Sequence, residues 1–399
     1  MKMLRLPRAK VQLGAPLPWN IRDELGRLLL SKGHVISTEG QLDAVLQRGA
    51  FVDIEDIKAA AAEATDTSAG HARNAPPNLF ELWRQSAEDL KSALTGLEQQ
   101  VDFGRTLDRF ADHIIGLLDQ QPDIALYQCV RQEQLHLYYY GYSHAVQTAV
   151  LCQLMARQLN WPEARQRSLV KAALTMNLSI LDLQGQMAGQ DGPVRERQRA
   201  AILAHPQQAV AMLQKAGIDD ADWLGAVAQH HERPEGGTYP KSEQPLSEMA
   251  VALRVADVFM AKISPRLLRS PLSPQEAIRQ LYREDQGGPL STAVVKVFGI
   301  YPPGDVVRLA SGEWAVVVQR TSNAKAPIVA TITDNAGQPV AHTLQLDSGL
   351  PAHAIVGTAP DNRLVAKLPP ERLYGYAMPS DDLLERLKAL REGSGGPVL

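Results

Sequence analysis

The chain has 399 residues, enough for two or three domains with a sizeable core. A net charge of −3 and a sequence pI of about 6.4 exclude a global basic field of the kind that recruits nucleic acid. No apolar run approaches a membrane span, the first residues lack the apolar middle of a signal peptide, and two cysteines are too few for a disulfide framework. We therefore expect a cytoplasmic protein without nucleic-acid partners or membrane spans.

The first part of the chain, residues 1–57, is predicted to be a small β module. Short apolar runs are broken there by turns, and the DELG turn at residues 23–26 predicts a hairpin. A short helix is expected next, with Thr38 as N-cap and Gly49 just past its end, followed by the extended run AFVDI. Residues 58–78 are alanine-rich and then polar, which is typical of a linker.

The rest of the chain divides into a helical and a β-rich part. Over residues 79–299 apolar residues recur at helical spacing, as in HAVQTAVLCQLMARQL. Residues 300–399 return to β character, with one strand pair expected around the Ser311-Gly312 turn and another around residues 334–337. A short amphipathic helix is predicted over residues 380–391. The predicted fold class is mainly α, a helical bundle flanked by the N-terminal β module and a C-terminal β appendage.

Residue types that bind metals recur in order through the helical part. They are His144, His205, the pair His230-His231 and Asp257. Imidazole and carboxylate side chains suit divalent transition metals, and wide spacing of this kind is typical of a site built across several helices. The alternative is a hydrogen-bonded polar cluster without a metal. The sequence therefore predicts that these five side chains converge in space.

Four short motifs in this part resemble one known family. They are HHERPEGGTYP at residues 230–240, HP at 205–206, AD at 256–257 and SPRLLR at 264–269. In this order they resemble the HD-GYP domain, whose members are bacterial metal-dependent phosphodiesterases acting on cyclic di-GMP, and the likeness spans roughly residues 130–300. The family pattern is HHExxDGxGYP. The resemblance implies an HD-domain-like helical bundle and a role in cyclic di-GMP signalling.

The departures from the family pattern fall on the residues that carry its chemistry. The HD pair that names the family corresponds to Met176 and Asn177, and the Gly-Lys that usually follows is Ser179-Ile180. Tyr140 stands where some members have a carboxylate, while Glu235 and Thr238 replace Asp and Gly in the loop motif. The resemblance therefore implies a degenerate site.

What the lost pair means for a metal can be argued from ligand chemistry. Hydrolysis at a two-metal site needs a carboxylate that bridges both ions, and the neutral amide of Asn177 bridges poorly. The thioether of Met176 is a poor ligand for hard ions. By resemblance, His205, His230 and His231 would serve one ion, and only His144 and Asp257 would remain for the other. We expect no catalytic residues, and we leave two alternatives equally open, one divalent ion (Fe, Mn or Zn) or none.

Two further groups of residues are assigned through the resemblance. The first is cationic and suits the phosphates of a nucleotide: Arg233, Lys262, Arg266 and Arg269. The alternative for these residues is a solvated basic face or pairing with acids within the fold. The second is a loop that the family also uses toward cyclase partners: Gly236, Gly237, Thr238, Tyr239 and Pro240.

Together these features predict a bacterial, cytoplasmic signalling protein of degenerate HD-GYP type that binds cyclic di-GMP or a related nucleotide, or a protein partner such as a diguanylate cyclase domain, without hydrolysis. The alternative is an active metal-dependent cyclic di-GMP phosphodiesterase or phosphohydrolase with a mononuclear or rearranged site. A homodimer is compatible with both.

Overall fold

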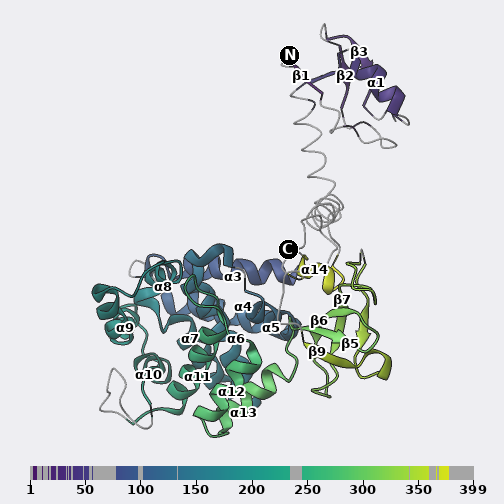
Figure 1. The fold of residues 1–399 in the computed structure, drawn as a ribbon. Helices are drawn as coiled ribbons and strands as arrows, with labels where there is room; N and C mark the ends of the chain where they lie inside the picture. Colours follow the sequence, from purple (N-terminus) through teal and green to yellow (C-terminus); the bar gives the residue numbers. More distant parts are fainter. Residues whose placement is uncertain are drawn as a thin grey trace. The chain divides into compact units, whose positions relative to one another are not determined.

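The computed structural model gives two compact units, residues 1–77 and 78–399, which are described separately (Figure 1). The residues that the structure describes are 3–6, 11, 17, 19–23, 26–32, 34, 36, 39–47, 49–53, 56, 78–97, 102–132, 134–233, 245–340, 342–358, 365 and 368–376. Among these residues, no helix is both long and apolar enough to cross a membrane. The predicted linker up to residue 77 and the predicted helix over residues 380–391 lie outside them.

The N-terminal unit is a small antiparallel sheet with one helix. Its strands are β1 (Met3–Arg5), β2 (Ile21–Arg22), β3 (Leu28–Leu30) and β4 (Phe51–Asp53), in the order β1-β4-β2-β3, and its helix is α1 (Glu39–Gln47). The predicted hairpin is confirmed, because β2 pairs antiparallel with β3 and the Gly26 N–H closes the turn on the Asp23 carbonyl at 3.0 Å. Gly49 adopts φ +76°, the left-handed conformation expected just past a helix end.

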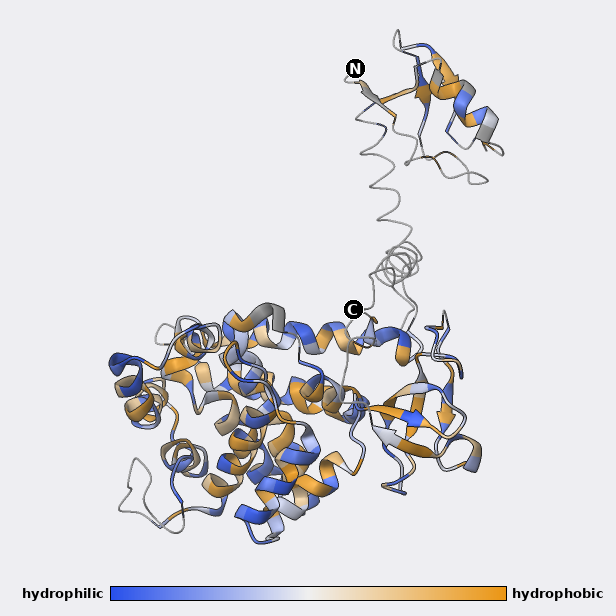
Figure 2. Ribbon diagram, in the orientation of Figure 1, coloured by the Kyte–Doolittle hydropathy of each residue, from blue (hydrophilic) through white to orange (hydrophobic). Residues whose placement is uncertain are grey.

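The second unit is mainly helical, as predicted. Its helices are α3 (Leu79–Leu94), α4 (Phe103–Gln120), α5 (Pro122–Val130), η3 (Gln134–Tyr139), α6 (Tyr140–Gln158), α7 (Glu163–Thr175), η4 (Leu178–Ile180), α8 (Leu181–Ala188), α9 (Glu196–Lys215), α10 (Ala221–Gln229), α11 (Glu248–Ile263), α12 (Pro274–Glu284) and α13 (Pro289–Phe298). Helix α6 is buried along most of its length and packs against α3, α7, α8, α11 and α13. Figure 2 shows hydrophobic and hydrophilic stretches alternating along most of the other helices, as expected when one face lies in the core.

Two glycines allow α8 to lie directly against the start of α6. A Cβ atom added to Gly141 would lie 2.2 Å from the Leu181 carbonyl oxygen, and one added to Gly185 would lie 2.2 Å from the Tyr138 carbonyl oxygen. Both obstacles are backbone atoms, so the contact is possible only where both positions lack a side chain. The adjacent Tyr142 hydroxyl donates to Asp182 Oδ1 at 2.9 Å. This contact fixes the helix start from which His144 projects.

The C-terminal strands form a five-stranded antiparallel sheet within the same unit. They are β5 (Val306–Leu309), β6 (Trp314–Gln319), β7 (Ile328–Thr331), β8 (Gln345–Asp347) and β9 (Ile355–Thr358), in the order β8-β7-β6-β5-β9. Both predicted pairs are confirmed, β5 with β6 and β7 with β8. Edge strand β9 was not predicted. Its side chains are half-buried or exposed throughout, so its composition carries little core signal.

The sheet and the segments around it are joined to the helices by ion pairs and by a shared hydrophobic core. The Arg320 guanidinium on the segment after β6 pairs with the buried carboxylate of Asp123 on α5. The short helix α14 (Pro370–Leu373) returns to α3, where Arg84 pairs with Glu371 at 2.9 Å. The helices and much of the sheet therefore share one hydrophobic core.

One carboxyl at this junction makes stability depend on pH. Burial raises the pKa of Asp305 to about 6, although Gln275 donates a hydrogen bond to it. Because the unfolded pKa is near 4, Asp305 contributes stability that is full below about pH 4 and is lost as the pH rises through about 6. We expect the free energy of unfolding of the wild type, minus that of Asp305→Asn, to fall across this window in urea titrations. A pH-independent difference would contradict the assignment.

Candidate metal centre

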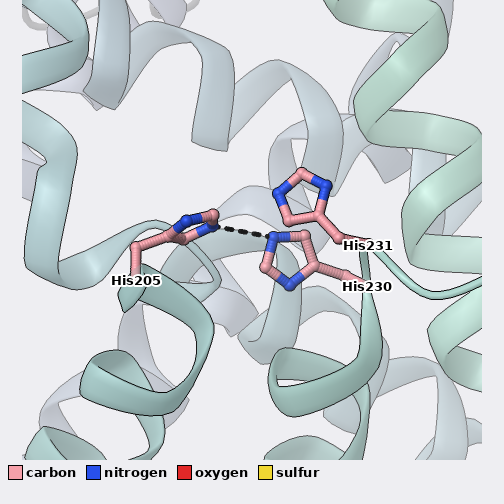
Figure 3. A group of neighbouring side chains, drawn as sticks. All are labelled: His205, His230 and His231. Carbon is pink, nitrogen blue, oxygen red and sulfur yellow. Dashed lines mark hydrogen bonds between the residues drawn. The ribbon is translucent and has the colours of Figure 1, made fainter. Parts of the chain in front are cut away.

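Three of the predicted histidines converge where the C-terminal end of α10 meets the middle of α9. His205 lies on α9, His230 is the C-terminal cap of α10, and His231 follows it. One ring nitrogen from each residue lies within 4.8 Å of the others (Figure 3). His205 and His230 are buried, and His231 is partly buried. The site is therefore a compact three-imidazole donor set, large enough for one ion.

The ring orientations of His205 and His230 are set by their own helices. His205 Nδ1 lies 2.6 Å from the Ile202 carbonyl oxygen, and His230 Nδ1 lies 2.8 Å from that of Val227. A carbonyl oxygen only accepts, so Nδ1 carries the proton in both rings and Nε2 is left with a lone pair. Histidines that bind metals commonly donate their other ring N–H in this way.

The two Nε2 atoms face each other at 3.1 Å, which has a chemical consequence (Figure 3). Two acceptor lone pairs at this distance repel unless a proton or a cation lies between them. Burial lowers the pKa of His205 to about 4, and burial together with the neighbouring imidazoles lowers that of His230 to about 3. Both rings are therefore neutral near pH 7, the form that binds metal. This donor set fits one divalent ion.

The other two predicted ligands are brought together as a separate pair. His144 on α6 and Asp257 on α11 are joined by a 2.7 Å contact between Nε2 and Oδ1. Burial alone would raise the pKa of Asp257, but the His144 hydrogen bond and the nearby imidazoles lower it well below its usual range. The carboxylate therefore stays charged, and one of its oxygens is already engaged with His144.

The positions of the lost HD pair are buried and carry no charge. Met176 caps the C-terminus of α7, and Asn177 follows it at the start of η4. Asp182, the carboxylate six residues after Met176, accepts a hydrogen bond from the Tyr142 hydroxyl. The structure therefore places a thioether and an amide where the family pattern has an imidazole and a carboxylate.

The predicted cationic residues differ in their surroundings. Arg266 donates from Nη2 to the Tyr140 hydroxyl at 2.7 Å, and its guanidinium lies 5.0 Å from the ring centroid of Tyr140. Arg269 donates to the Ala261 carbonyl, and Lys262 pairs with Glu284 at 2.9 Å. These contacts satisfy part of each cation's hydrogen-bonding capacity.

Of the remaining predicted residues, Arg233 is described by the structure and residues 236–240 are not. Arg233 is exposed two residues past the histidine pair. The predicted interaction loop at residues 236–240 lies outside the described residues.

Sequence reasoning missed the role of Tyr140. Its ring stacks on that of His144, with centroids 5.5 Å apart and planes 8° from parallel, while its hydroxyl accepts from Arg266. The spacing of four residues from Tyr140 to His144 places both on one face of α6 and is the signal that could have suggested this stacking. Tyr140 therefore connects Arg266 to the His144–Asp257 pair.

Parts of the chain are similar in sequence to known proteins. Residues 126–287 match the model of the HD domain family. The chain is 27% identical over 239 residues to the cyclic di-GMP phosphodiesterase PA4108 of Pseudomonas aeruginosa. The matched stretch is 58% of this chain and 57% of that protein. It is 25% identical over 162 residues to the 3'3'-cGAMP-specific phosphodiesterase 1 of Vibrio cholerae serotype O1. This match is 40% of this chain and 37% of that protein.

The matches are partial in extent. The chain spans little more than half the length of the first of these relatives and less of the second. Among solved structures, Bd1817, a HDG"Y"P protein from Bdellovibrio bacteriovorus, aligns with 74% of this chain and 99% of its own at 12% identity, with a TM-score of 0.44. The match to the HD domain family therefore covers residues 126–287, which lie within the mainly helical second unit.

Proposed function

We propose that this HD domain is a non-hydrolytic receptor for a cyclic dinucleotide, built around one divalent ion held by His205, His230 and His231. The observation that carries the ion is the pair of Nε2 atoms facing each other at 3.1 Å with both Nδ1 protons committed to carbonyl groups. When bound, such an ion supplies a Lewis-acid contact for a phosphoryl oxygen. Imidazole-only ligation favours zinc or iron over harder ions.

The same site argues against hydrolysis. A second ion would have to take its protein ligands from His144 and Asp257, which are bonded to each other at 2.7 Å. No carboxylate stands at Asn177 to bridge two ions, and Met176 offers no hard donor. Activation of water between two ions therefore lacks both the second ligand set and the bridge.

The nucleotide class is supported by the relatives and by nearby cations. The names of both curated relatives specify cyclic dinucleotides. Arg266 keeps donor groups beyond those that contact Tyr140, because a guanidinium carries five N–H groups. Arg233 is exposed and follows the histidine pair. Both arginines carry guanidinium groups, which can donate charge-assisted hydrogen bonds to a phosphate of cyclic di-GMP.

The test is calorimetric titration of cyclic di-GMP into the full chain, with and without added Mn²⁺, followed by chromatography for linear product. We expect saturable binding and no product. Arg266→Lys keeps the charge but removes the planar donor fork, so we expect it to weaken binding by about 10-fold. The matched control is Arg279→Lys, an exposed arginine on α12 paired with Glu276. Absence of binding in all conditions would refute the receptor proposal.

An active phosphodiesterase with one ion is the second candidate, and the intact three-histidine donor set favours it. Formation of linear dinucleotide that depends on added metal and is abolished by His231→Ala would replace the receptor proposal with this one. The partner role of residues 236–240 stays a prediction, since that loop lies outside the described residues.

A further inference from the structure

A cavity of about 410 Å³ is lined by residues of α3, α5 and α6. Its volume is within the roughly 300–1,000 Å³ typical of small-molecule sites. The residues of α6 that line it include Ser143, Gln147 and Val150, which lie on a different face of the helix from His144. None of His205, His230 and His231 is among the residues that line the cavity, so it is separate from the three-histidine donor set.

The walls of the cavity are aromatic and amide-rich. Trp83, Tyr139 and Tyr140 line it, and Gln147 and Gln128 are among four glutamines that do so. Flat aromatic walls with a few polar groups favour a flat ligand that has hydrogen-bonding groups at its edge.

Two polar atoms in these walls are buried without hydrogen-bond partners among the described residues. They are the indole Nε1 of Trp83, a donor only, and the amide Oε1 of Gln147, an acceptor. A buried polar group without a partner costs free energy, and a native structure that retains two of them at one cavity needs an explanation. A ligand that carries a carbonyl beside an N–H offers an acceptor for the indole and a donor for the amide oxygen once these side chains turn toward the cavity.

The charged residues of the cavity favour an uncharged ligand. Arg84 is paired with Glu81 at 2.5 Å and with Glu371 at 2.9 Å, and Arg131 Nε donates to the Gly304 carbonyl at 2.6 Å. Arg84 is therefore engaged with two carboxylates, and Arg131 with one backbone carbonyl. A phosphate at Arg84 would have to compete with Glu81 and Glu371, whereas a neutral heterocycle would not.

We propose that this cavity binds a neutral, planar heterocycle with a lactam edge, of the nucleobase class, at a site distinct from the histidine centre. Tyr140 lies between the two sites, because it lines the cavity and stacks on His144. A ligand in the cavity therefore contacts a side chain that also supports the candidate centre.

The test uses the full chain labelled with 5-fluorotryptophan, which gives one ¹⁹F signal for each of Trp19, Trp83, Trp161, Trp223 and Trp314. Loss of a signal in Trp83→Phe assigns it. The probes are hypoxanthine and purine, which share a ring system and differ in the lactam edge. We expect hypoxanthine to shift the Trp83 signal saturably and purine to bind at least about 10-fold more weakly, the effect of losing hydrogen bonds to buried groups.

Variants separate this site from the histidine centre. Gln147→Met keeps the length of the side chain but removes the acceptor, and we expect it to weaken hypoxanthine binding about 10-fold while the Trp83 signal stays dispersed. His230→Ala should leave hypoxanthine binding unchanged. An unmoved Trp83 signal, equal responses to the two probes, or loss of binding in His230→Ala would each overturn the proposal.

Discussion

Gly185→Ala is expected to lower the free energy of unfolding of the helical unit by about 3 kcal/mol, at the upper end of overpacking effects. The new methyl carbon would lie 2.2 Å from the Tyr138 carbonyl oxygen, so α8 and η3 would have to separate. Backbone cannot rotate away as a flexible side chain does. The measurement is urea unfolding followed by far-UV circular dichroism, which the helices of this unit dominate.

The matched control is Gly116→Ala on α4. No atom lies within 4 Å of a Cβ placed there, and the position is within a helix. Alanine loses less backbone freedom on folding than glycine, so this change should stabilise the protein by about 0.5–1 kcal/mol. Equal effects of the two substitutions would mean that the close approach of α8 is not a constraint on the fold.

His230→Ala is expected to abolish metal binding at the three-histidine donor set. The wild type purified without chelator should contain one divalent ion per chain by elemental analysis, and the variant should contain essentially none. Because changes even to the residues that orient metal ligands cost 10–100-fold in affinity, loss of a ligand should cost at least about 100-fold. An ion present at 100 times its dissociation constant stabilises a protein by about 2.7 kcal/mol, so added Zn²⁺ should raise the melting temperature of the wild type alone.

Two other histidine variants sharpen this test. His113→Ala changes an exposed histidine on α4 and should leave the metal content unchanged. His144→Ala should also retain the ion if one centre is formed by the three converging histidines. A wild-type content of two ions that drops to one in His144→Ala would contradict the single-ion proposal and favour a dinuclear site.

Local patterns in the sequence predicted much of the fold. The DELG turn and the Ser311-Gly312 turn lie between strands that pair as expected, because register in a short hairpin is set by the turn itself. The helical period predicted α6. The order of the family motifs predicted that five side chains would converge, and three of them, His205, His230 and His231, form one donor set. The turns and helices depend on residues close in sequence. The meeting of the histidines was predicted from a family whose members share one tertiary arrangement.

Features that depend on distant contacts could not be predicted. The sequence does not indicate that His144 would bond Asp257 directly, or that Tyr140 would accept from Arg266. Nor does it indicate that Gly185 would approach the Tyr138 carbonyl, since glycine also occurs in turns and loops. In each case the partner is set by how whole helices pack, which no local pattern encodes.

The contacts of α14 with α3 bring the two ends of the helical unit together. The Phe80 ring lies 5.0 Å from that of Tyr374 and 6.0 Å from that of Tyr376, and the Arg84–Glu371 pair lies beside them. Three side-chain contacts therefore join the first helix of this unit to its last described segment. These contacts hold the start of α3 beside the end of α14 without involving the helices that carry the histidines.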